Sequence, residues 1–143
     1  MTGMSMTTIS NEDEKRLRAV WSSIGVPSRL AEASLDNYQP GCTEQERALE
    51  KCRMFAGQGI DNIAQGNGLF LQGPVGTGKS HLSVATLRAM VEANPGRFGR
   101  LASRYLVYGE QEYSGYRCFM IPVFELLERL RQSYRSGNAR RIM

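Results

Sequence analysis

The sequence has little of the chemistry that builds metal centres or membrane spans. Its 143 residues include three cysteines and one histidine, without a Cys-x-x-Cys pair, so no zinc site is predicted. We interpret Cys42, Cys52 and Cys118 as reduced core thiols. The longest apolar run covers seven residues, from Cys118 to Phe124, and is interrupted by Pro122, whereas a membrane helix needs about 20. Because residues 1–10 also lack the features of a secretory signal, we expect a cytoplasmic protein without a membrane partner.

Negative charge is scarce in the last third of the chain. Residues 97–143 carry nine arginines and four glutamates, whereas residues 1–96 carry nine basic and ten acidic side chains. No aspartate follows Asp61. The last third is therefore basic, although genomic base composition can produce the same arginine bias. The length allows one domain.

The spacing of apolar residues predicts four helices joined by loops. Thr43 and Glu46 have the spacing of a capping box at the start of the second helix. A glycine-rich loop is expected at 57–68 and a surface hairpin at 97–117. The predicted helices cover about residues 11–24, 43–57, 79–93 and 122–137.

Two short apolar segments, Leu69–Leu71 and Cys118–Ile121, have the pattern of buried parallel strands. Each is followed by a predicted helix. The order strand, helix, strand, helix predicts an α/β fold in which helices flank a parallel sheet.

An eight-residue motif carries the chemistry of the sequence. Residues 73–80 read GPVGTGKS and match G-x-x-x-x-G-K-[ST] in full. In such a loop backbone N–H groups converge on the β-phosphate, while Lys79 reaches the β- and γ-phosphates and Ser80 ligates Mg²⁺. An ordinary glycine-rich turn, the alternative, requires neither the lysine nor the hydroxyl. The candidate nucleotide-binding residues are Gly73, Pro74, Val75, Gly76, Thr77, Gly78, Lys79, Ser80 and the adjoining His81, which also suits a packing role.

The carboxylate that hydrolysis requires is not where a P-loop ATPase would have it. Such enzymes use a carboxylate at the end of another strand to hold Mg²⁺ and to orient the attacking water. The acidic residues after Ser80 are Glu92, Glu110, Glu112, Glu125 and Glu128, and none of them ends an apolar strand. From the motif we predict ATP and Mg²⁺ as ligands. Because no carboxylate is in the expected position, we predict that this chain alone hydrolyses ATP at no more than background rate.

Several segments together resemble one group of proteins. They cover residues 25–27, 33–38, 68–82, 124–127 and 131–134. The chain is similar over these segments to the DnaC-like bacterial replicative helicase loaders and the related IstB-like transposition helper ATPases of the AAA+ superfamily.

This resemblance implies a P-loop NTPase (AAA+-like) parallel sheet with flanking helices. Residues 1–28 would form an N-terminal helix and linker, and residues 29–143 a partial nucleotide-binding domain, incomplete at the C-terminus because the Walker B, sensor and arginine-finger elements would follow Met143. Leu35 and Tyr38 would lie near the adenine, or would simply fill the core.

The resemblance also implies delivery of a replicative helicase to single-stranded DNA, with self-association and a partner contact near Trp21. A transposition helper that binds a transposase is the alternative, and a small P-loop kinase and a truncated, non-catalytic nucleotide-binding product are further ones. The candidate DNA-binding residues are Arg129, Arg131, Tyr134 and Arg135, because arginines bind phosphates and an aromatic ring can stack on a base. A solvated helix face is the simpler interpretation of the same residues.

Overall fold

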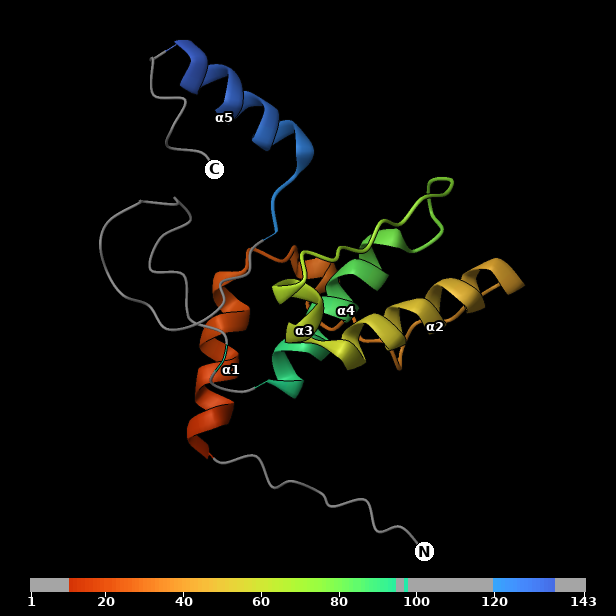
Figure 1. Cartoon of the computed structure of the whole chain (residues 1–143). Helices are drawn as coiled ribbons and strands as arrows, with labels where there is room; N and C mark the ends of the chain where they lie inside the picture. Colours follow the sequence, from red (N-terminus) through yellow and green to blue (C-terminus); the bar gives the residue numbers. More distant parts are fainter. Residues whose placement is uncertain (1–10, 95–96, 98–119, 136–143) are drawn as a thin grey trace, which may run out of the picture.

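The computed structural model describes residues 11–94, 97 and 120–135. Figure 1 shows α4 beside α2, α1 along another side of α4, and α5 apart from the α2–α4 pair. The elements in chain order are α1 (Asn11–Ser23), the short 3₁₀ helix η1 (Ser28–Leu30), α2 (Thr43–Gln58), α3 (Ile60–Ala64), α4 (Lys79–Ala93) and α5 (Val123–Arg135). None of these helices is both long enough and apolar enough to span a bilayer.

The four helices predicted from the apolar spacing are confirmed within a residue or two. The capping box is wrong, because Cys42 is the N-cap of α2 and no side chain caps it there. Thr43 is already helical. Gln45 instead accepts a hydrogen bond from the Gly41 N–H, which fixes the turn that enters the helix.

A buried core joins α2 to α4. Cys52 and Ala56 of α2 face Leu82, Ala85 and Met90 of α4, and their small side chains let the helices approach closely. The thiol prediction holds for Cys52, which is free and buried. Cys42 is also free but exposed, so its placement in the core is wrong, and Cys118 lies outside the described residues.

The opposite side of α4 carries the N-terminal part of the chain. Val20 and Ile24 pack on Val91, and Leu30, the last residue of η1, belongs to a cluster with Val84. The segment that enters α5 is attached here as well, because the Met120 N–H donates to the carbonyl oxygen of Ile24 at 2.8 Å. α4 is therefore covered on two sides by helical and loop segments.

The α/β parallel sheet is wrong for the part of the chain that the structure describes, where no residue lies in a strand. Leu69–Leu71 is extended without strand pairing, and the Phe70 side chain is 86% exposed. Leu71 packs against the α2–α4 core. A buried parallel strand needs neighbouring strands for its backbone hydrogen bonds, and the described residues provide none. Cys118 and Phe119 of the second expected strand, and residues 98–117 of the hairpin expected at 97–117, lie outside these residues.

The segment 57–68, which its glycine content predicts to be a loop, contains the short helix α3. Gly59 turns the chain with φ of 52°, and α3 follows it. Asn62 is buried there, and its Nδ2 donates to the Phe55 carbonyl oxygen at 3.0 Å. The backbone carbonyl oxygen of Asn62 accepts a hydrogen bond from the backbone N–H of Asn67 at 2.8 Å. The Asn62 side chain thus bonds one of the last carbonyl groups of α2 and connects α3 to that helix.

We expect Leu82→Ala to lower the free energy of unfolding by about 2–4 kcal/mol, because it leaves a cavity between α2 and α4. The matched control is Leu127→Ala on α5, where the side chain is 58% exposed and the change should be within about 0.5 kcal/mol. Urea unfolding followed by circular dichroism measures both. Equal losses would contradict the described core.

Candidate functional site

The loop of residues 73–78 leads directly into α4. Gly76 and Gly78 have φ angles of 84° and 81°, in the left-handed region that side chains with a Cβ avoid. Gly78 is the N-cap of α4. The two glycines therefore provide the turns by which the loop enters the first turn of α4.

Unpaired backbone donors gather at this end of α4. The N–H groups of residues 75–81 make no hydrogen bond to any other described residue. A helix N-terminus also carries a partial positive charge. Free N–H groups and a helix dipole together form the arrangement that binds phosphate and other anions.

Lys79 brings a full positive charge to the same loop. Its Nζ donates to the carbonyl oxygens of Gly73, at 2.8 Å, and of Pro74, and lies 3.4 Å from Thr77 Oγ1. Thr77 Oγ1 itself donates to the Pro74 oxygen at 2.8 Å. No carboxylate of the described residues forms an ion pair with Lys79. Phosphate oxygens can replace the neutral carbonyls, because charge-assisted hydrogen bonds are stronger.

Ser80 fits the role of a Mg²⁺ ligand. It is exposed in the first turn of α4, and its hydroxyl makes no hydrogen bond to another described residue. Mg²⁺ accepts oxygen ligands, and keeps water or substrate phosphates in its other positions. The described residues contain no cluster of three or more His, Cys, Asp or Glu side chains suited to a metal ion.

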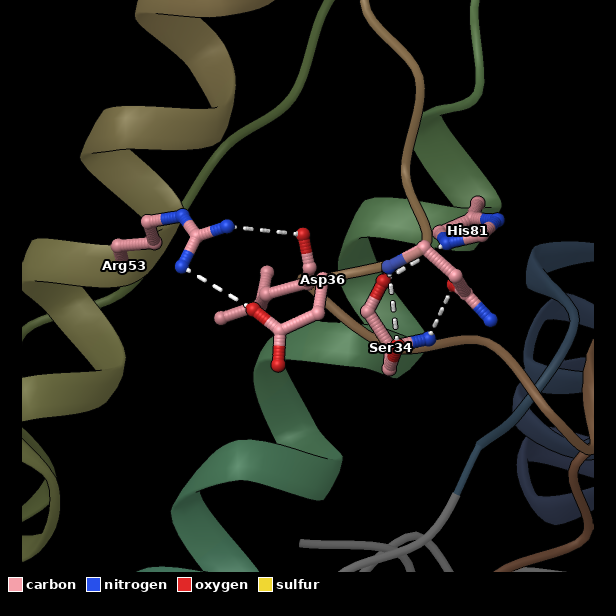
Figure 2. A network of polar contacts seen from close by, with 6 residues as sticks. Ser34, Asp36, Arg53 and His81 are labelled. Atoms are coloured by element: carbon pink, nitrogen blue, oxygen red, sulfur yellow. Dashed lines mark hydrogen bonds and ion pairs between the residues drawn. The ribbon is translucent and has the colours of Figure 1, made fainter.

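A tight turn precedes α2 and lies between α2 and α4 (Figure 2). Ser34 and Asn37 bond reciprocally: the Ser34 N–H donates to Asn37 Oδ1 at 2.9 Å, and the Asn37 N–H donates to Ser34 Oγ at 3.1 Å. On the α2 side, Arg53 reaches the Leu35 carbonyl oxygen at 3.2 Å and Asp36 Oδ1 at 3.3 Å. On the α4 side, His81 Nε2 lies 2.9 Å from the Ser34 oxygen. The turn is thus attached to both helices.

Tyr38, which follows this turn, connects it to the loop of residues 73–78. Its hydroxyl donates to the Thr77 carbonyl oxygen at 2.9 Å, and its ring lies so close to Gly78 that a Cβ there would meet Cε2 at 2.5 Å. The His81 ring packs beside it, with centroids 5.4 Å apart. Burial raises the pKa of the Tyr38 hydroxyl, so it remains a proton donor at neutral pH.

Leu35 and Tyr38 both fill the core, each 9% exposed. Their contact with adenine stays a prediction. The sequence interpretation missed the bonds made by Asn37 and Arg53. The Ser-x-x-Asn spacing was a usable signal for the first, whereas the Arg53 contact had no local signature.

The candidate DNA-binding residues all lie on α5. Arg129 pairs with Glu125, and Arg131 lies 3.6 Å from Glu128, so two of the arginines are engaged within the helix. Tyr134 and Arg135 are exposed. Their contact with single-stranded DNA stays a prediction. The arginines at 140 and 141 lie outside the described residues.

A separate cleft of about 470 Å³ lies between α1 and the C-terminal half of α4. Its lining includes Trp21, Arg88 and Glu92. The Arg88 guanidinium lies 4.5 Å from the centre of a Trp21 ring, a cation–π contact. Trp21 thus packs between the helices at the other end of α4 from the loop, and its expected contact with a partner protein stays a prediction.

Comparisons with protein-family models, curated proteins and solved structures found no match for the chain.

Alanine substitutions of glycines separate backbone strain from the contact with Tyr38. Gly76→Ala should cost about 1–2 kcal/mol of unfolding free energy from its positive φ alone, because a Cβ there meets nothing within 4 Å. Gly78→Ala should cost more, because the new Cβ also collides with the Tyr38 ring. Urea unfolding measures both losses.

The matched control is Gly57→Ala inside α2, where a Cβ also meets nothing within 4 Å. It should stabilise the protein by about 0.5–1 kcal/mol. Equal losses for Gly76→Ala and Gly78→Ala would show that the Tyr38 ring does not constrain the loop.

Proposed function

We propose that the chain binds the Mg²⁺ complex of ATP through residues 73–81. The observation that carries the proposal is the loop itself, in which unpaired N–H groups and the Lys79 ammonium gather at the N-terminus of α4. All of these donors belong to the loop and to α4, so phosphate binding does not depend on a sheet.

Each residue has a separate part in this binding. The N–H groups of residues 75–81 surround the phosphate chain, and Lys79 exchanges the carbonyls of Gly73 and Pro74 for phosphate oxygens. The Ser80 hydroxyl supplies one oxygen to Mg²⁺, which neutralises charge between the phosphates. Gly76 and Gly78 keep the loop free of side chains at its turns.

The wider role that we propose comes from the sequence resemblance. The protein would act in DNA replication as a helicase loader that delivers a replicative helicase to single-stranded DNA. A transposition helper is the alternative, and a truncated product that binds nucleotide without catalysis is another. Binding of the purified chain to a replicative helicase, compared with its binding to a transposase, separates the first two roles.

Lys79→Ala should weaken ATP binding at least about tenfold, the equivalent of 1.4 kcal/mol, because it removes the charge opposite the phosphates. Titration with a fluorescent ATP analogue, with and without Mg²⁺, measures the Kd. Lys51→Ala is the matched control, since Lys51 is an exposed lysine on α2, and it should leave the Kd unchanged. Equal affinity of the unaltered chain and Lys79→Ala would refute the proposed site.

The same proteins test hydrolysis. Phosphate release by the unaltered chain should stay at background, as expected from the positions of the acidic residues in the sequence. A turnover that Lys79→Ala abolishes would contradict this expectation.

A further inference from the structure

The hydrogen bond from Tyr38 to Thr77 acts on a single peptide unit of the loop. In a trans peptide the C=O and the following N–H point in opposite directions, and the described residues contain no cis peptide bond. Because the Tyr38 hydroxyl holds the Thr77 carbonyl, the Gly78 N–H of the same peptide points away from Tyr38. That N–H is one of the unpaired donors of the loop.

The Tyr38 side chain is itself held on several sides. Its ring is buried in the α2–α4 core and touches Gly78, where a Cβ could not be accommodated. The turn before it is bonded to α2 through Arg53 and to α4 through His81 (Figure 2). A hydroxyl fixed in this way can hold a peptide in one orientation without loss of freedom at the moment of binding.

We propose that Tyr38 is a positioning residue for phosphate binding, which holds the Thr77–Gly78 peptide so that the Gly78 N–H is presented to the phosphate chain. The inference rests on the proposed function and makes it more specific. In this proposal Tyr38 affects phosphate binding indirectly, by holding the loop, whereas the sequence resemblance places Tyr38 near the adenine. A residue that acts on the phosphates must matter equally for a ligand that has no base.

The test compares ATP with inorganic tripolyphosphate, both with Mg²⁺. Tyr38→Phe keeps the buried ring and removes only the hydroxyl, and we expect it to weaken both ligands by the same factor, about fivefold, as for the loss of one hydrogen bond. Tripolyphosphate is measured by competition against a fluorescent ATP analogue. Ser22→Ala is the control, because it also removes a hydroxyl, one that bonds within α1, and it should change neither Kd.

Two outcomes would overturn the proposal. Loss of affinity for ATP alone would place Tyr38 at the adenine, and unchanged affinity for both ligands would show that the loop does not need the hydroxyl. The amide signals of Gly78 and Lys79 in ¹⁵N–¹H spectra of the ligand-free protein provide a second measurement. They should shift in Tyr38→Phe and not in Ser22→Ala, and unchanged signals would also overturn the proposal.

Failure of the proposed function has a different signature. In that case the unaltered chain binds neither ATP nor tripolyphosphate, and Lys79→Ala changes nothing. Failure of the positioning role instead leaves the unaltered chain binding both ligands, with Lys79→Ala defective and Tyr38→Phe normal.

Discussion

The packing of α4 against α2 is the contact on which the loop of residues 73–78 depends. The loop buries little of its own, and the Val75 side chain at its tip is fully exposed. Its position is therefore set by α4, which it enters directly, and α4 is held by the contact of Leu82 and Ala85 with Cys52 and Ala56. Small side chains at this contact bring the helices close enough for the turn before α2 to reach both. The loop is thus oriented by the core beneath it together with the contacts that Tyr38 makes to Thr77 and Gly78.

The four longer helices, α1, α2, α4 and α5, could be predicted because their signal is local. Apolar residues repeat at helical spacing, and Gly59 and Asn94 follow the ends of α2 and α4. The sheet could not be predicted, since an apolar run such as Leu69–Leu71 indicates that a segment is suited to be a strand but not that a partner strand lies beside it. In the described residues Leu71 packs against the helical core, whereas the Phe70 side chain is exposed. The sheet prediction therefore failed because strand pairing depends on segments that are distant in the sequence, which a local pattern does not reveal.

The candidate site also has a part that could be predicted from the sequence and a part that only the structure shows. Residues 73–80 form a contiguous motif, so the loop, its lysine and its hydroxyl could be read from the sequence alone. The bond from Tyr38 to Thr77 joins residues 39 positions apart, and no spacing rule connects them. The reciprocal Ser34 and Asn37 bonds lie between these cases, because their three-residue spacing is a known turn signal. What can be read from the sequence is thus the chemistry of the site, and what requires the structure is the support that orients it.

Binding and hydrolysis of a nucleotide place different demands on such a chain. Binding uses groups within one short segment, and here all of them lie at one end of α4. Hydrolysis needs a carboxylate from elsewhere, and the described acidic residues after the loop are poorly placed for it. Glu92 lies about 20 Å along α4 from Lys79, at 1.5 Å per residue, and Glu125 and Glu128 pair with arginines on α5. Within the described residues no carboxylate pairs with Lys79, whereas the Tyr38 hydroxyl bonds the loop and Arg53 bonds the turn before α2.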